Sequence, residues 1–301
     1  MGGRLRSLTD SPFISQHAAS ITLLASKINE AKVVQIITPA DIEGVLAMIQ
    51  LESAFLDLGI NYRRKILPQL RHVGGDDDYE IPELEGFIIR ISPNSDAITK
   101  LVIESEYVEI SPLTTEFSIS SSTKKHIGAV DCVLFCSAIA STLSPEGSRV
   151  RKVRPLTVTG SWLRQGSEVN YDPVYSFLRD HLDDEGSIDV RPITEVENIE
   201  TGMVPNLSER MLKKLTKSWP EMNFEERSSA LSELVLPVLR TDTISTMRLE
   251  ELIWHRIVIP GCPTDIASQL KIAQDNWPMK DEEARLYASQ VADKLLTNGY
   301  F

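Results

Sequence analysis

Two carboxylates, Asp41 and Glu43, lie in a short turn between an apolar segment, Val33–Thr38, and a longer segment whose apolar residues recur at helical spacing. The first segment is β-branched and predicts a buried strand; the second predicts an amphipathic helix over 45–58. Carboxylates at the end of a strand can hold a divalent cation that generates a nucleophile. They can also cap the helix that follows, because its amino-terminal dipole favours negative charge. We expect capping.

The turn belongs to a predicted strand–helix–strand unit around which the chain is organised. Gly59 is placed to end the helix, and Tyr62–Leu67 predicts the second strand. A parallel crossover of this kind is right-handed in nearly all proteins, and open α/β sheets place their chemistry at the carboxyl ends of the strands. The following segments are predicted as two strands, a loop rich in Ser and Thr, and a buried helix: Gly86–Ile91, Lys100–Glu104, Ser111–Lys125 and Ile127–Leu143.

An acidic stretch divides the chain. Residues 1–181 are predicted to form an α/β domain with a parallel sheet flanked by helices. Residues 182–205 are acidic and irregular and are interpreted as a connector. Residues 206–301 carry only helical patterns and are predicted to pack on the core. The fold class is therefore α/β, followed by a mostly helical carboxyl-terminal portion.

Composition restricts the classes of function. The net charge of −12 disfavours broad, sequence-independent binding to DNA, which needs a basic surface. No apolar run approaches the roughly 18 residues of a membrane span, and the first ten residues do not resemble a signal peptide. The three cysteines do not form a disulfide framework, and the five histidines are scattered without ligand spacing. No metal ion and no cofactor are predicted.

Two short basic runs could line a surface for single-stranded DNA. Their residues are Arg63, Arg64 and Lys65 in the first run and Arg149, Arg151, Lys152 and Arg154 in the second. Aromatic residues make up only 6% of the chain and are not interleaved with these bases, so the runs offer little platform for base stacking. The alternative interpretation is a solvated face that balances nearby acids.

Four segments in order resemble motifs of the DHH phosphoesterase superfamily, to which the RecJ exonucleases belong. Thr38–Gly44 resembles the first motif, in which a strand ends in metal-binding aspartates, and 128–143 resembles the small-residue helix that follows the DHH motif. Pro260–Pro263 and Trp277–Arg285 resemble a later turn and helix start. The resemblance covers nearly the whole chain and implies a parallel sheet. The family's second domain has no clear counterpart in the sequence.

The motif positions depart from the family pattern. Asp41 and Glu43 match the first motif, but Pro39 replaces its histidine. The second motif falls on 92–94 and the fourth on 158–163, neither with an acid, and the third falls on Glu104 without its two histidines. A two-metal phosphoesterase needs several converging carboxylates and imidazoles. The resemblance therefore implies no catalytic residues, with Asp41, Glu43 and Glu104 as vestigial positions.

Loss of the site is typical of the Cdc45 branch of this superfamily, whose domain is a structural part of the replicative helicase. Membership of the archaeal form of that branch implies a non-catalytic subunit that binds GINS and helps to assemble or activate MCM. It also implies a location in the cytoplasm, at the nucleoid. Single-stranded DNA is a further candidate partner, and no membrane is. Two alternatives stay open: a divergent metal-dependent phosphoesterase or exonuclease acting on oligonucleotides through the three acids, and a module that binds single-stranded DNA.

Overall fold

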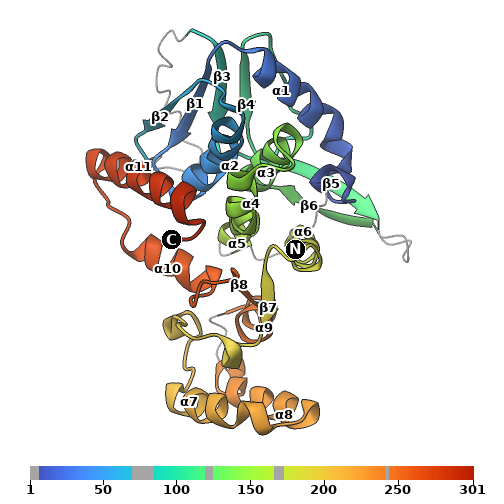
Figure 1. The fold of residues 1–301 in the computed structure, drawn as a ribbon. Coiled ribbons are helices and arrows are strands. Elements are labelled where there is room, and N and C mark those ends of the chain that lie inside the picture. Colours follow the sequence, from blue (N-terminus) through green and yellow to red (C-terminus); the bar gives the residue numbers. More distant parts are fainter. Residues whose placement is uncertain (1–6, 70–84, 119–124, 166–172, 241–243) are drawn as a thin grey trace.

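A four-stranded sheet lies at one end of the molecule (Figure 1). The computed structural model describes residues 7–69, 85–118, 125–165, 173–240 and 244–301. The strand order is β2-β1-β3-β4 and all three pairings are parallel. Val34 is in register with Tyr62 on one side and with Phe87 on the other. The strands are β1 (Val34–Pro39), β2 (Tyr62–Leu67), β3 (Phe87–Ile91) and β4 (Tyr107–Ile110).

The predicted strand–helix–strand unit is confirmed. Helix α2 (Ile42–Leu58) connects β1 to β2, begins at the cap residue Asp41 and ends at Gly59, whose φ of 69° is left-handed. Every residue of β1 is buried, as are all residues of α2 from Glu43 to Phe55. A helix that is buried all round lies in the core, and α2 does so because other helices pack on the sides that the sheet leaves free.

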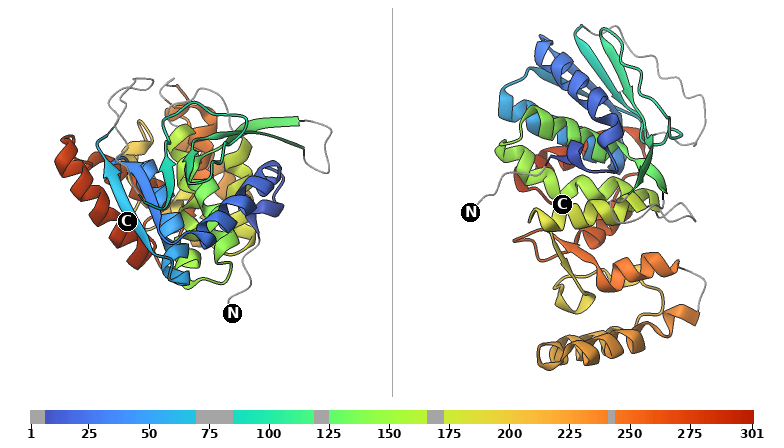
Figure 2. Two further views of the ribbon diagram at one scale, coloured as in Figure 1. Left: turned by 90° about the horizontal axis from the view of Figure 1, so that it is seen from above. Right: turned by 90° about the vertical axis from the view of Figure 1, so that its right-hand side faces the viewer.

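A layer of helices covers one face of the sheet. Helices α1 (Ala18–Glu30), α2 and α3 (Cys132–Leu143) pack on one another and lie on the same side of the strands (Figure 2). In β3, Phe87, Ile89 and Ile91 are buried, whereas Ile88 and Arg90 are only partly buried. Because side chains alternate between the two faces of a strand, the buried set faces the helices.

Two sequence predictions in this part are wrong. Lys100–Glu104 forms only an isolated bridge at Ile103, and the fourth strand is β4, which begins further along the chain at Tyr107. The predicted loop 111–125 contains β5 (Leu113–Ser118), which pairs antiparallel with β6 (Lys125–Val130). Its threonines are polar but β-branched, and they suit a strand. The helix predicted from Ile127 therefore begins later, at Cys132.

The chain then passes beneath the helical layer. Helices α4 (Ser148–Val153), α5 (Thr159–Gln165) and α6 (Pro173–Asp184) lead into the segment predicted as an irregular connector. That segment is more regular than predicted, because β7 (Asp189–Arg191) pairs antiparallel with β8 (Arg256–Val258), which lies far along the chain. This two-stranded ribbon lies between the body that contains the sheet and the helices α7 and α8 (Figure 1).

The carboxyl-terminal helices divide into two groups. Helix α11 (Asp281–Asn298) contacts α2, α4 and β2, and α10 (Ile266–Asp275) contacts β8 and α5, so packing on the core is observed for these two. Helices α7 (Glu209–Ser218) and α8 (Phe224–Val235) instead form a distal lobe away from the sheet, with α9 (Thr246–Trp254) between (Figures 1 and 2). Within the described ranges, no helix combines the length and apolarity that crossing a bilayer needs.

Candidate functional site

Asp41 lies at the carboxyl end of β1, and both of its carboxylate oxygens accept hydrogen bonds. Oδ1 accepts from the backbone N–H of Gly44 at 2.7 Å and so caps α2. Oδ2 accepts from the side-chain amide of Asn94, which follows β3, at 3.0 Å. Burial raises the pKa of Asp41 to about 6, and the two hydrogen bonds only partly oppose the effect. Asp41 thereby links the ends of two neighbouring strands.

Glu43 lies in the first turn of α2 and is only 8% exposed. Among the residues that the structure describes, none forms a hydrogen bond with its Oε1. Burial raises the pKa of Glu43 well above its usual range; the nearby carboxylate of Asp131 raises it further, and the guanidinium of Arg164 lowers it. Burial therefore favours the protonated form of this carboxyl group, and Arg164 opposes that effect.

Asp131 completes the group, although none of the motifs in the sequence includes it. It is fully buried and caps α3, its Oδ1 accepting from the N–H of Leu134 at 2.9 Å and its Oδ2 from the hydroxyl of Ser161 at 2.5 Å. Burial raises the pKa of Asp131. A Cβ added at Gly160 would lie 2.0 Å from Oδ1, so the glycine allows the close approach. We call Asp41, Glu43 and Asp131 the acidic site.

A positive charge reaches the acidic site from α5, where the resemblance placed the fourth motif. The guanidinium of Arg164 lowers the pKa of both Glu43 and Asp131, and its Nη1 donates to the carbonyl of Pro93 at 3.0 Å. Trp277 also reaches the turn that carries Asp41, since its Nε1 donates to the carbonyl of Ala40 at 2.8 Å. The site therefore joins three parts of the chain far apart in sequence.

The acidic site does not fit a two-metal centre. Oxygens that would coordinate cations instead accept from Gly44, Asn94, Leu134 and Ser161. Among the residues that the structure describes, no three His, Cys, Asp or Glu side chains are grouped so that they could hold a metal ion. The acids are arranged to cap two helices and to accept hydrogen bonds from within the protein.

Glu104 does not belong to the acidic site. It is exposed, and its backbone N–H donates to the carbonyl of Tyr107 at 2.9 Å, in the turn that leads into β4. Because β4 ends at Ile110, the carboxyl end of this strand is occupied by Ser111. Glu104 therefore precedes β4, and the segment Leu101–Ile103, which the third motif was expected to follow, is not a strand of the sheet.

Two of the basic residues predicted to face DNA are engaged in ion pairs within the protein, one fully buried and one partly buried. Arg154 is fully buried, with Nε 2.7 Å and Nη2 3.0 Å from the carboxylate of Glu185. The prediction that Arg154 faces DNA is wrong. Arg64 makes a bidentate pair with Glu52 of α2 at 2.9 and 3.0 Å and contacts Asp293 of α11 at 2.8 Å. Arg64 thus connects α11 to β2, the edge strand of the sheet.

The other basic residues are more accessible. Arg149 is paired with Asp57 at 3.2 Å, Arg151 is paired with Glu146, and Lys152 donates to the carbonyl of Thr297 at 2.7 Å. Arg63 and Lys65 on β2 point away from the helical layer, because Arg64 between them points toward it. In the part of the chain that the structure describes, Arg63 and Lys65 make no ion pair.

Comparison with known proteins identifies the fold. No family model and no curated protein matches the sequence. The structure is similar to that of CDC45 from Entamoeba histolytica, with a TM-score of 0.50 and 10% identity over 95% of this chain and 69% of that chain. RecJ in complex with Mn2+ from Thermus thermophilus is aligned over 98% of this chain and 39% of its own length, with a TM-score of 0.34 and 14% identity. The chain thus has a Cdc45-like fold, as the sequence motifs predicted.

Proposed function

We propose that this protein is a non-catalytic, archaeal-type Cdc45-like subunit of a replicative helicase, which binds GINS and helps to assemble or activate MCM at the nucleoid. The observation that carries the proposal is the hydrogen bond from Asn94 to Asp41 at the end of the sheet where a phosphoesterase would bind metal. The likeness of the fold to CDC45 supports the replication role.

Electrostatics favours a structural role for the acidic site. Closely spaced carboxylates repel one another unless protons, cations or hydrogen-bond donors compensate them. In this protein Arg164 provides a cation, Asn94 and Ser161 provide donors, and Glu43 has a strongly raised pKa. Each of these groups is part of the chain, so the site is compensated without an added ion.

The proposed partners follow from the fold likeness, and contact with single-stranded DNA rests on Arg63 and Lys65. These two side chains project from an edge strand without an intramolecular acid among the described residues. Two cations make a limited contact with phosphates, in keeping with a net charge of −12. We propose that DNA is touched locally and that the protein partners supply most of the binding energy.

The experiment is affinity purification of the tagged full chain from its native cells at moderate salt. Recovery of GINS, with or without MCM, is expected. The variant Asp41→Asn should recover the same partners, because the proposed role needs the cap and not the charge. If neither variant nor wild type retains any component of the replication machinery, the helicase role fails.

The main alternative is a divergent phosphoesterase, and one observation favours it. Oε1 of Glu43 is buried near Asp41 and has no hydrogen-bond partner within the described ranges. A single weakly held cation beside these two acids would satisfy it. This alternative predicts manganese-dependent hydrolysis that disappears in Asp41→Ala.

A further inference from the structure

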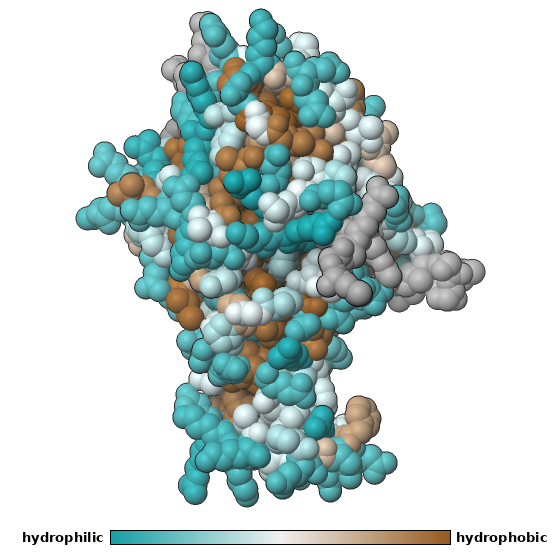
Figure 3. All heavy atoms as spheres, in the orientation of Figure 1, coloured by the Kyte–Doolittle hydropathy of each residue, from teal (hydrophilic) through white to brown (hydrophobic). Residues whose placement is uncertain are grey.

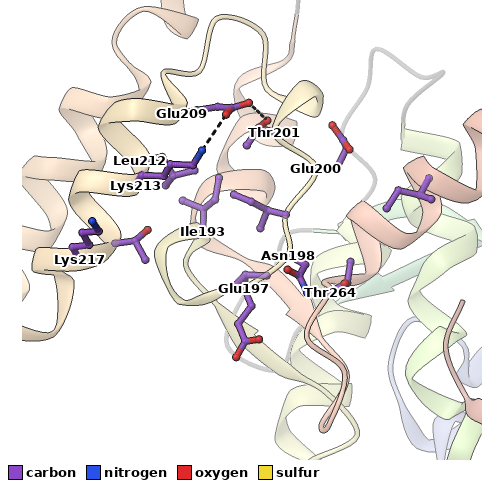
Figure 4. A pocket seen from close by; sticks show the side chains of 14 residues that line it. Ile193, Glu197, Asn198, Glu200, Thr201, Glu209, Leu212, Lys213, Lys217 and Thr264 are labelled. Carbon is purple, nitrogen blue, oxygen red and sulfur yellow. Dashed lines mark hydrogen bonds and ion pairs between the residues drawn. The ribbon is translucent and has the colours of Figure 1, made fainter.

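The largest cavity does not select a ligand by charge. It has a volume of about 690 Å³ and lies between α7, α10 and the segment 193–201. Figure 3 shows apolar side chains gathered in this region, between the body and the distal lobe. Glutamates and lysines share its lining, among them Glu197, Glu200, Lys213 and Lys217 (Figure 4). A smaller cavity beside α6 differs, because acids and aromatic rings line it together.

The smaller cavity, about 240 Å³, lies between residues 11–13, β5 and α6. Each of these three segments contributes one phenylalanine to its walls: Phe13, Phe117 and Phe177. Phe13 and Phe117 are only 2% and 5% exposed, so their rings lie deep, and Phe177 is partly buried. Pockets for drug-sized ligands have volumes of about 300–1,000 Å³. This one, which we call the phenylalanine cavity, therefore suits a single head group.

The three rings stand nearly at right angles, as the walls of a box do. The ring centroids of Phe13 and Phe117 are 6.4 Å apart with an interplanar angle of 74°, and those of Phe117 and Phe177 are 5.3 Å apart at 86°. His126 of β6 stacks on Phe117 at 5.5 Å and holds that ring in place. The face of an aromatic ring attracts cations, and boxes of such rings recognise quaternary ammonium groups.

Two aspartates of α6 line the cavity beside the rings. Asp180 and Asp184 are four residues apart and therefore lie one turn apart on the same side of the helix, and both are exposed. Arg179 donates to Asp180 at 2.9 and 2.8 Å but also pairs with Glu251, so two carboxylates share one guanidinium. No lysine or arginine is among the described residues that line the cavity. The lining therefore favours a cation.

His181 is the other titratable side chain in the lining. Its Nδ1 lies 3.2 Å from the hydroxyl oxygen of Ser11, and its Nε2 lies 3.7 Å from the carboxylate of Glu185. A protonated ring would thus lie beside an acid of its own, and imidazole is ordinarily neutral at about pH 8. The charge of the lining at this pH is set by the two aspartates.

The phenylalanine walls offer no hydrogen-bond acceptor to a cation. An ammonium N–H that enters between the rings would lose water without gaining an acceptor there, which costs free energy. Methyl groups on the nitrogen remove these donors, keep the positive charge and bury apolar surface against the rings. A methylated ammonium group therefore suits the cavity better than the amine of an unmodified lysine.

We propose that the phenylalanine cavity binds a trimethylammonium group, carried by a methylated lysine of a partner protein or by a small molecule of the choline class. The group enters between the three rings, and Asp180 and Asp184 attract its charge. The proposal rests on the composition and geometry of the cavity and does not depend on the replication role.

The first probes are choline and its uncharged isostere, the alcohol in which a carbon atom replaces the nitrogen. Saturation-transfer NMR with the full chain at about pH 8 detects the binding of each probe, and titration gives the two affinities. Choline should bind roughly tenfold more tightly than the isostere, because only choline carries the charge that the rings and the acids attract.

A second pair of probes distinguishes the sources of the group. An acetylated trimethyl-lysine amide should bind, and the same compound without the methyl groups should bind several-fold more weakly. Binding of the trimethyl-lysine compound without choline would assign the cavity to a modified protein. Binding of choline without the trimethyl-lysine compound would assign it to a small molecule. Either result supports the proposal.

Variants connect the binding to the cavity. Phe177→Leu keeps an apolar side chain but removes one ring, and it should weaken binding of the preferred probe by roughly five- to tenfold. The double variant Asp180→Asn, Asp184→Asn removes both charges without changing the shape and should weaken it several-fold. Two matched controls should bind as wild type does: Phe224→Leu, at an exposed ring outside the cavity, and Asp183→Asn, at an acid of α6 that does not line it.

Thermal melting confirms that each variant is folded, which is expected because the substituted side chains are at least partly accessible. Three results would overturn the proposal: equal binding of choline and its isostere, equal binding of the methylated and unmethylated lysine compounds, or binding that is unchanged in Phe177→Leu. Absence of saturation transfer to both choline and the trimethyl-lysine compound at millimolar concentration would also overturn it.

Discussion

The side-chain amide of Asn94 donates a hydrogen bond to Oδ2 of Asp41 at 3.0 Å and joins the carboxyl ends of β3 and β1. In a metal-dependent phosphoesterase, a divalent cation compensates acids of this kind. An amide donor provides part of the same compensation but cannot activate water. The other oxygen of Asp41 caps α2, so the residue contributes to the fold through both oxygens.

The raised pKa of Asp41 makes stability depend on pH. The pKa rises from 3.8 to about 6 on folding, so the native state binds the proton more tightly and stability falls as pH rises from about 4 to 6. The variant Asp41→Asn keeps the cap and does not titrate. The difference in free energy of unfolding between this variant and wild type should increase across this window by up to about 3 kcal/mol. This value corresponds to a pKa shift of about two units. Urea unfolding at several pH values measures the difference. A difference that does not vary with pH would contradict the account.

The close approach of Gly160 to Asp131 predicts a steric requirement. Gly160→Ala would bring a methyl group to 2.0 Å from Oδ1 and should destabilise the protein by about 1–3 kcal/mol, as overpacking of a core does. Gly202→Ala is the control, because its nearest neighbour would be a flexible glutamate oxygen at 3.1 Å. Denaturant unfolding of both variants gives the comparison. Equal stability of the two variants would show that the contact between Gly160 of α5 and Asp131 does not require a glycine.

The buried pair between Arg154 and Glu185 should matter for folding. Arg154→Ala would leave the carboxylate of Glu185 buried without its guanidinium partner, at a cost of about 3–5 kcal/mol. Arg149→Ala removes an exposed partner of Asp57 and should cost less than about 1 kcal/mol. Thermal unfolding distinguishes the two variants. A small effect of Arg154→Ala, together with weaker DNA binding, would restore the interpretation of this basic run as a DNA surface.

Arg63 and Lys65 should account for any contact with single-stranded DNA. The double variant Arg63→Glu, Lys65→Glu is expected to weaken binding to a labelled oligonucleotide. It should reduce the slope of log K against log salt by about 1.4, since each phosphate contact on a single strand contributes about 0.7. Arg149→Glu is the comparison, because Arg149 is also exposed but already pairs with Asp57. An unchanged slope in the double variant would exclude β2 from the DNA contact.

The central crossover could be predicted from sequence because its signals are local. A β-branched run, a helical apolar period and Gly59 follow one another closely along the chain, and each agrees with the others. The fourth strand was misplaced because the apolar residues Leu101–Ile103 look as strand-like as Tyr107–Ile110. Only the second segment pairs with β3 and extends the sheet. The first segment does not, and its Val102 is 69% exposed. The local sequence pattern does not determine which of these two segments pairs with a neighbouring strand.

The acidic site could be predicted only in part, because its members meet through the tertiary fold. Asp41 was found from its place at the end of a strand. Asp131 lies far along the chain from Asp41, and its one sequence signal was that of a cap before an apolar helix. The second motif position was interpreted as the loss of an acid, whereas Asn94 acts there as a donor. The burial of Arg154 depends on Glu185, which no spacing within the basic run reveals.

Manganese uptake tests the central claim of a non-catalytic, internally compensated acidic site most directly. Wild type and Asp41→Ala are titrated with Mn2+ while the spectrum of the free ion is followed by electron paramagnetic resonance, and the same samples are incubated with end-labelled single-stranded DNA. The account predicts that both proteins leave the ion free and the DNA intact. Uptake of Mn2+ by wild type with DNA cleavage, both lost in Asp41→Ala, would contradict it and establish the phosphoesterase instead.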